Sequence, residues 1–170
     1  MQLKEGKERF IEAWGALGSS WGITRTMAQI HALLLVSTVP LSSDDVMKQL
    51  QISRGNVNTN MRMLVEWTLV HKKLIPGERK EFFVAEKEMS KVVKSIIIAR
   101  RKRELEPMLR LLDELTEVGG DNDEAEGFRS VISDLKLYSN KADKALDALI
   151  KVDSNWFFST FLSFIKWSFP

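Results

Sequence analysis

The chain has 170 residues, a net charge of +2, and 44% hydrophobic and 28% charged residues. These values are ordinary for a globular protein and argue against extensive disorder. The absence of cysteine excludes disulfides, thiolate metal sites and cysteine nucleophiles, and it fits a reducing cytoplasm. The charged N-terminus predicts no signal peptide, and the apolar stretches at residues 30–39 and 156–169 are too short to span a bilayer as helices.

Charge is unevenly distributed along the chain. Residues 1–52 carry five Lys and Arg against five Asp and Glu. Residues 53–103 carry thirteen against five, a net charge of +8, and residues 104–170 carry seven against thirteen, a net charge of −6. A basic middle beside an acidic end is typical of a polyanion-binding segment joined to a part with another role.

The first two predicted helices cover residues 3–18 and about 25–37. Gly and Ser residues at 18–22 should interrupt the first helix. The second helix is apolar on most sides, so we expect it to be buried. Pro40 ends it, because proline cannot continue a helix.

Two shorter helices follow, joined by a tight connection at residues 51–52. Ser42 or Ser43 can cap the third helix, and Ser53 can cap the fourth, which continues to about Trp67. One row of apolar side chains on the fourth helix repeats at helical spacing: Val57, Met61 and Leu64. This row should face inward and leave the opposite side of the helix polar.

A β-hairpin and two long helices complete the predicted order. Strands at residues 70–75 and 81–84 flank a basic turn that begins with Pro76-Gly77, a pair that favours a turn. A long helix over residues 86–118 contains Pro107, which should kink or split it. After a linker at residues 119–122, a further helix should run over residues 124–152 and precede a tail dense in aromatic residues.

The predicted fold class is mainly α with a small two-stranded β wing: a winged helix-turn-helix with long dimerisation helices. Residues 1–21 would form an N-terminal helix used in dimerisation. Residues 22–86 would form the winged helix-turn-helix domain that binds DNA. Residues 87–170 would form a helical dimerisation region that ends in the aromatic tail.

The outward face of the fourth helix carries residue types that suit base edges in the major groove of duplex DNA. Arg can donate two hydrogen bonds to guanine, and Asn pairs with adenine in the same bidentate way. The candidates for base contacts are Arg54, Asn56, Asn58, Thr59 and Arg62. The candidates for contacts with the DNA backbone are Ser53, Lys72, Lys73, Arg79 and Lys80. Taken alone, an amphipathic helix of this kind is usually only a solvated face, but the adjacent basic hairpin favours DNA binding.

Four blocks in order resemble the GbsR branch of the MarR-type regulators: residues 40–46, 52–57, 64–70 and 76–83. The resemblance covers roughly residues 1–118. It implies a cytoplasmic, dimeric, winged-helix DNA-binding repressor or activator whose terminal helices dimerise, with a small effector in some members. Residues 28–32 depart from the glycine- and tyrosine-containing pattern common in the family, so the roles of that pattern are not carried over.

Several further clusters have competing interpretations. The basic run at residues 100–103 would either touch DNA phosphates or pair with Glu104 and Glu106, and pairing is favoured. His31 and His71 lack partners at metal-ligand spacing, so no metal site is predicted, and His31 should be a hydrogen-bonded packing residue. The aromatic tail after residue 155 could form a dimer interface, an aromatic cage for a quaternary ammonium ligand, or a membrane-surface helix, and the interface is favoured.

No catalytic motif is present. The sequence lacks a nucleophile elbow, a P-loop and a glycine-rich dinucleotide loop, so we expect neither an enzyme nor a cofactor. The expected partners are double-stranded DNA, a second copy of the chain and a small effector at an unknown site, with no membrane. Two rivals remain: a winged-helix module that docks proteins without touching DNA, and a sensor whose main task is ligand capture.

Overall fold

The computed structural model describes residues 1–151. The chain divides into two units, Met1–Val92 and Val93–Pro170. The three interpretations of the aromatic tail concern residues outside the described part.

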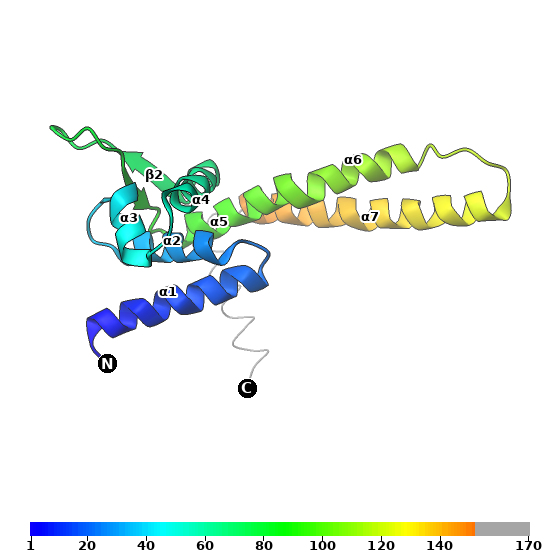
Figure 1. The fold of residues 1–170 in the computed structure, drawn as a ribbon. Coiled ribbons are helices and arrows are strands. Elements are labelled where there is room, and N and C mark those ends of the chain that lie inside the picture. Colours follow the sequence, from blue (N-terminus) through cyan, green and yellow to red (C-terminus); the bar gives the residue numbers. More distant parts are fainter. Residues whose placement is uncertain (152–170) are drawn as a thin grey trace. The chain divides into compact units, whose positions relative to one another are not determined.

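The first unit contains four helices and three short strands (Figure 1). They follow in the order α1 (Leu3–Ser20), α2 (Arg25–Val36), β1 (Leu41–Ser42), α3 (Ser43–Leu50), α4 (Arg54–Glu66), β2 (Val70–Lys73) and β3 (Phe82–Ala85). Helix α2 lies at the centre and is buried from Met27 to Leu34 apart from a half-buried Gln29, as its apolar composition predicts. The side chains that fill this core come mainly from α2, α3, α4 and β2: Met27, Ile30, Leu34, Val46, Val57, Leu64 and Val70.

Helix α1 passes through Gly18 instead of ending there, so the predicted interruption at this residue is wrong. Gly15 and Gly18 are buried on the side that faces α2. A Cβ atom on Gly18 would clash with the Cβ atom of Ala28, closer than non-bonded carbon atoms approach each other. The glycine therefore serves close helix packing, and the helix ends only after Ser20, before the positive φ of Gly22.

Buried His31 departs from its prediction in one respect. It packs in the core near Trp14, with ring centroids 6.2 Å apart and only 3% of the residue exposed. Its Nε2 atom, however, has no hydrogen-bond partner in the structure. Burial lowers the pKa of His31 to about 4, because the charged imidazolium would lose its hydration.

The start of α3 and its end are both fixed by local backbone chemistry. Ser42 accepts a hydrogen bond from the backbone of Asp45, and the Asp45 carboxylate accepts one from the backbone of Ser42, which makes a reciprocal capping box. Gln51 then adopts a left-handed conformation with φ of 53° and ends the helix. This turn leads the chain directly to Ser53, which caps α4.

The sheet has one strand more than the predicted two-stranded wing. Strand β1 pairs antiparallel with β3, which also pairs antiparallel with β2, so the strand order is β1-β3-β2. β1 is only two residues long and leads directly into α3, which is why alternation along the sequence gave no strand signal. The β1–β3 pairing fixes the base of the wing to the start of α3.

The second unit is built from helices that are mostly elongated and amphipathic. α5 (Met89–Arg100) spans the unit boundary, and a π-helical turn, η1 (Arg101–Leu105), joins it to α6 (Glu106–Leu115). The predicted single helix over residues 86–118 is thus interrupted just before Pro107, which has no N–H to donate to the preceding turn. The N–H of Glu106 donates instead to the carbonyl of Arg101, five residues back.

Helix α7 (Asp123–Lys151) runs beside α6 in the opposite direction (Figure 1). Three ion pairs join α7 to η1 and α6: Arg101 Nε to Asp143 Oδ1 at 2.6 Å, Arg101 Nη1 to Asp147 Oδ1 at 3.8 Å, and Lys136 Nζ to Asp113 Oδ1 at 2.8 Å. The Arg101 guanidinium holds the pKa of the Asp143 carboxyl below its usual value. We call α6 and α7 with η1 the helical hairpin.

Ion pairing within the chain explains most of the basic run at residues 100–103. Arg100 and Arg103 both pair with Glu104, at 3.0 and 3.6 Å, while Arg101 pairs with Asp143. Glu106 pairs with Arg110 instead of with the run. The pairing interpretation is therefore confirmed for Glu104 but not for Glu106.

The predicted fold class is confirmed: the chain is mainly helical, with a small antiparallel sheet in a winged-helix arrangement. Within residues 1–151, none of the helices has the length and apolar character needed to cross a membrane.

Candidate nucleic-acid interface

Helix α4 separates its side chains into a buried and an exposed set. Val57, Met61 and Leu64 are buried in the core of the first unit, as their spacing predicts. All five candidates for base contacts lie on the exposed side: Arg54, Asn56, Asn58, Thr59 and Arg62. The helix therefore presents a continuous polar surface about one helix wide, the size that fits the major groove.

A partly buried polar contact that the sequence analysis missed anchors α4 to α2. The hydroxyl of Thr24 caps α2 by accepting from the N–H of Met27, and it donates to Asn60 Oδ1 at 2.8 Å. The Asn60 amide donates in turn to the carbonyl of Asn56 at 2.8 Å. Asn60 lies one turn from Val57 and from Leu64, on the inward face of α4. A polar side chain at such a position needs a hydrogen-bond partner within the protein, so the sequence held a signal for this contact.

Three of the candidate cations form ion pairs at the surface. Asp44, in the first turn of α3, accepts from Arg54 at 2.6 Å and pairs with Lys80 at 3.2 Å. Lys80 and then Arg54 lower the pKa of the Asp44 carboxyl through these hydrogen bonds. Lys72 pairs with Glu81 at 2.7 Å across the base of the wing.

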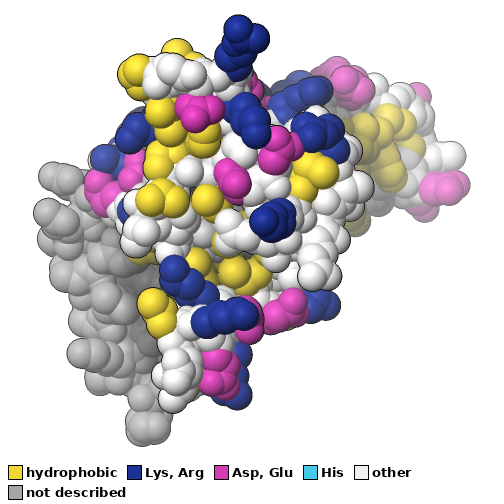
Figure 2. All heavy atoms as spheres, turned by 60° about the vertical axis from the view of Figure 1, so that its left-hand side comes forward, with side chains coloured by type: hydrophobic (Ala, Val, Ile, Leu, Met, Phe, Trp, Pro, Cys, Tyr) yellow, Lys and Arg dark blue, Asp and Glu magenta, His cyan; other side chains and the backbone are white. Residues whose placement is uncertain are grey.

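The other three cations are free to meet a ligand. Among the described residues, Arg62, Lys73 and Arg79 are exposed and form no ion pair. Figure 2 accordingly shows Lys and Arg side chains interleaved with carboxylates over this face, without one uninterrupted basic patch. DNA phosphates would meet free cations directly but would compete with Asp44 and Glu81 for the others.

The wing carries its cations beyond the sheet on a stiffened turn. Gly77 has a φ of +86° after Pro76, and the N–H of Glu78 donates to the carbonyl of Ile75 at 3.1 Å. Proline followed by a residue of positive φ is the geometry of a type II turn. Arg79 and Lys80 follow this turn, and Lys72 and Lys73 lie on β2, so four of the five predicted backbone contacts share one hairpin.

A hollow of about 450 Å³ lies between α4 and the wing. Its walls include Asn58 and Arg62 from the helix and Lys72, Glu81 and Phe83 from the hairpin. The fold therefore brings together two groups of candidates that are separated in sequence. Ser53, the remaining candidate, lies exposed at the start of α4, where its side chain caps the helix by accepting from the N–H of Asn56 at 3.3 Å.

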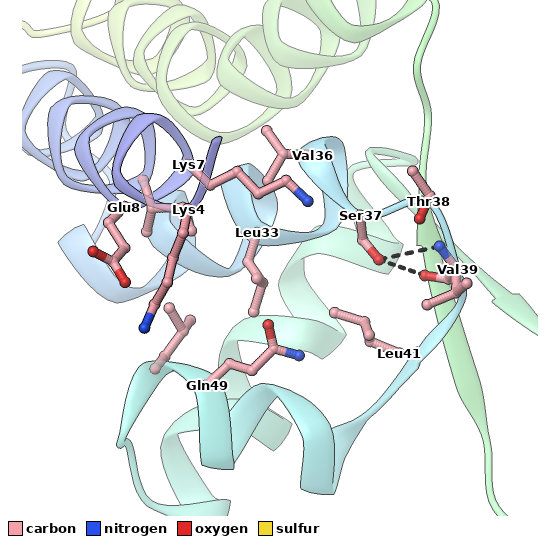
Figure 3. A pocket seen from close by; sticks show the side chains of 12 residues that line it. Lys4, Lys7, Glu8, Leu33, Val36, Ser37, Thr38, Val39, Leu41 and Gln49 are labelled. Atoms are coloured by element: carbon pink, nitrogen blue, oxygen red, sulfur yellow. Dashed lines mark hydrogen bonds between the residues drawn. The ribbon is translucent and has the colours of Figure 1, made fainter. Parts of the chain in front are cut away.

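A second hollow, of about 550 Å³, opens between α1, the end of α2 and α3. Leu33 and Leu41 line its interior, while Lys4 and Lys7 extend from α1 at its edge (Figure 3). Gln49 and Leu50, at the end of α3, form the wall nearest to the turn that leads into α4.

Two curated proteins are similar to this chain in sequence. The HTH-type transcriptional repressor GbsR of Bacillus subtilis is 22% identical over 112 residues, which are 66% of this chain and 62% of that protein. The HTH-type transcriptional regulator MmpR5 of Mycobacterium tuberculosis is 29% identical over 75 residues, 44% of this chain and 46% of that protein. The matches thus span less than two thirds of either relative.

The fold is found in a solved structure described as a transcriptional regulator. It superimposes with a TM-score of 0.56 over 81% of this chain and 95% of the other, at 21% identity. No protein-family model matches the chain. The chain therefore has a winged helix-turn-helix fold, and its sequence is similar to those of two HTH-type transcriptional regulators, one of which is GbsR.

Proposed function

We propose that this protein is a homodimeric transcriptional regulator that binds duplex DNA in a sequence-specific manner and acts as a repressor. The observation that carries the proposal is the exposed polar face of α4, which is held beside a cationic wing by the hydrogen bond from Thr24 to the buried Asn60. The names of the two curated relatives, a repressor and a transcriptional regulator, support it. No catalytic step is part of the proposal, and a cytoplasmic location is proposed with it.

The two groups of candidate residues would have different tasks. Asn56, Asn58 and Arg62 would read base edges, while the wing residues Lys73 and Arg79 would neutralise phosphates without regard to sequence. Arg54 and Lys80 would also contact the DNA, once their ion pairs with Asp44 are replaced by contacts with phosphate oxygens. This division predicts different consequences for specificity when single residues are removed.

A small effector would regulate the DNA complex from the hollow between α1, α2 and α3. The apolar interior suits an apolar body, and Lys4 and Lys7 at the edge suit an anionic group. A ligand there would press on the end of α3 and so change the setting of α4. An amphipathic anion is therefore the ligand class that we propose.

The test is a set of binding isotherms on duplexes selected from a random pool, measured over a series of salt concentrations. Arg62→Ala should weaken binding to the selected duplex by about 1–3 kcal/mol and relax the base preference at one position. Binding to random DNA should stay nearly unchanged. Arg79→Ala should weaken binding to both kinds of DNA about equally and reduce the slope of the binding constant against salt concentration by about one.

Arg110→Ala is the matched control, because it removes an exposed arginine from α6, far along the chain from α4 and the wing. It should leave both affinities unchanged. Binding of the wild-type protein that is weak and independent of salt would contradict the proposal and favour a protein-docking module. Equal losses on selected and random DNA for Arg62→Ala would contradict the assignment of base reading.

A further inference from the structure

Helix α4 buries a polar side chain among apolar ones. The structure describes this helix throughout, and its buried residues are Val57, Asn60, Met61 and Leu64. Asn60 is only 5% exposed, at a position where an apolar residue would continue the row that faces the core. Because a buried amide loses its hydration, its presence on this face requires a physical reason.

The Asn60 amide is fixed at both of its ends. The hydroxyl oxygen of Thr24 accepts the N–H of Met27, and its hydrogen is donated to Asn60 Oδ1 at 2.8 Å. The Nδ2 group at the other end of the amide donates to the carbonyl of Asn56, which can only accept. The bonds therefore run in one direction from α2 to α4, and they allow one orientation of the amide.

Loss of these bonds would leave no buried group without a partner. Thr24 is exposed, so its hydroxyl would bond to water if Asn60 were apolar. The carbonyl of Asn56 would keep the bond that it accepts from the backbone N–H four residues later in the helix. Asn60→Leu should therefore cost no stability, and the burial of its apolar side chain should add some.

Apolar contacts alone do not fix how far α4 is rotated about its own axis. The burial of Val57, Met61 and Leu64 is non-directional, whereas a hydrogen bond weakens steeply when its angle changes. A rotation of about 20° would move atoms at the outer radius of a helix, about 5–6 Å from the axis, by about 2 Å. Such a shift is sufficient to break the paired hydrogen bonds by which Arg or Asn distinguishes one base from another.

Asn56 is the exposed residue that these bonds hold most directly. Its backbone N–H donates to the Ser53 hydroxyl at 3.3 Å, and its carbonyl accepts from Asn60 at 2.8 Å. The peptide groups on both sides of Asn56 are therefore held, although the residue itself is exposed. Its side chain starts from a fixed point on the surface that is proposed to bind DNA.

We propose that Asn60 is a positioning residue that sets the rotation of α4 through Thr24 and Asn56, and thereby sets the selectivity for base sequence. The inference rests on the proposed function and adds to it a residue that touches no DNA. In coiled coils, a single buried Asn likewise fixes the register of the helices at a cost in stability. Stability and selectivity should therefore respond differently to the loss of Asn60.

Asn60→Leu separates the two effects. The variant should bind a duplex selected from a random pool about tenfold more weakly than the wild-type protein, the size of one lost base contact. It should bind random DNA as well as before, because cations contact phosphates whatever the sequence. Its base preference should relax at several positions, since the whole helix loses its setting, and its midpoint of urea denaturation should equal or exceed that of the wild-type protein.

Met61→Leu is the matched control for a change in the buried face of α4. It replaces the neighbouring buried residue by another apolar one of similar volume and leaves the hydrogen bonds of Asn60 intact. This variant should keep both the selectivity and the stability of the wild-type protein. A loss of selectivity in Met61→Leu as large as in Asn60→Leu would assign the effect to packing and overturn the inference.

A second pair of variants changes the other end of the contact. Thr24→Ser keeps the hydroxyl and should keep full selectivity. Thr24→Val keeps the shape but removes the hydroxyl, so it should lose selectivity as Asn60→Leu does. Because Thr24→Val also removes the cap of α2, its stability should fall, and its DNA binding is measured at a temperature where it is folded. Equal selectivity of the two Thr24 variants would overturn the inference even if Asn60→Leu did not fold.

The double variant Thr24→Val/Asn60→Leu tests whether the two residues act as one unit. It should lose no more selectivity than either single variant. Additive losses, or full selectivity in Asn60→Leu, would overturn the inference and leave the proposed function standing, provided that the wild-type protein prefers the selected duplex. A wild-type protein without that preference would overturn the proposed function itself, and the inference with it.

Discussion

Asp44 occupies an unusual position for a carboxylate on a face that is proposed to bind DNA. It lies in the first turn of α3, where a negative charge favours the helix dipole, and its two hydrogen-bond donors are Arg54 and Lys80. Both donors are candidate DNA contacts on different elements. The carboxylate therefore orients α4 and the wing relative to one another while it competes with the phosphates for their charges.

Asp44→Asn should tighten DNA binding several-fold at low salt, because it removes a repulsive charge and frees two cations for phosphate oxygens. The salt slope of the binding constant should rise with the number of cations released. Glu78→Gln is the control, since it removes a carboxylate from the same wing without freeing a cation among the described residues. Unchanged or weaker binding by Asp44→Asn would show that the orienting role outweighs the competition.

His31 should make the stability of the fold depend on pH. Its folded-state pKa of about 4 lies below the ordinary value of 6.5, so the unfolded chain binds a proton first as the pH falls. The free energy of unfolding should therefore drop by roughly 3 kcal/mol between pH 6.5 and 4, with no further loss from this group below that.

Urea denaturation of the wild-type protein and His31→Leu across this pH range checks the prediction. Leucine cannot titrate, so the difference between the two proteins should grow as the pH falls toward 4. Carboxylates with lowered pKa values, such as Asp45 and Asp143, titrate in both proteins and cancel in the difference. Parallel pH curves for the two proteins would show that His31 gains a partner on protonation.

At the scale of single elements, α1 contains two glycines that should respond oppositely to alanine. A Cβ on Gly18 would collide with Ala28, and both atoms belong to helices that cannot shift easily, whereas a Cβ on Gly6 meets nothing within 4 Å. Gly18→Ala should cost about 1–2 kcal/mol, since overpacking exceeds the gain in helix propensity. Gly6→Ala should gain up to about 1 kcal/mol.

Thermal denaturation at one fixed protein concentration measures both effects, because association would otherwise shift the midpoints. A stabilised Gly18→Ala protein would mean that α1 does not pack on α2 as closely as the structure has it.

Sequence patterns predicted the elements whose signals are local. The Ser53 cap and the Val57, Met61 and Leu64 row gave α4 to within about a residue, and the Pro76-Gly77 pair gave the turn of the wing. These features depend on residues a few positions apart. Cap chemistry and helical spacing are sufficient to specify them.

The features that were missed depend on partners distant in sequence. Strand β1 exists because β3 passes beside Leu41 and Ser42, and a glycine lies inside α1 at position 18 because Ala28 leaves no room there for a side chain. The ion pairs of Arg54 and Lys80 with Asp44 likewise require α3, α4 and the wing to meet. Composition placed these cations in the candidate site, but only the fold shows that a carboxylate already holds two of them.

At the scale of the whole molecule, a two-fold dimer requires a two-fold operator. Each copy would place one α4 helix in the major groove, so the half-site centres should lie about 34–36 Å apart, roughly one helical turn of DNA. The homodimer of the proposed function supplies the connection that makes binding to the two half-sites cooperative. The dependence of affinity on the spacing between half-sites therefore shows whether the two DNA-binding units of the dimer act together.

Insertion of five base pairs between the half-sites should reduce the affinity to that of one isolated half-site, because the second half-site then faces the other side of the duplex. A duplex that carries one isolated half-site gives the reference affinity. Electrophoretic mobility shifts at one salt concentration measure all three duplexes. If the wild-type protein tolerated the insertion, its two DNA-binding units would act independently, and the helical hairpin would serve a partner other than a second copy on the same operator.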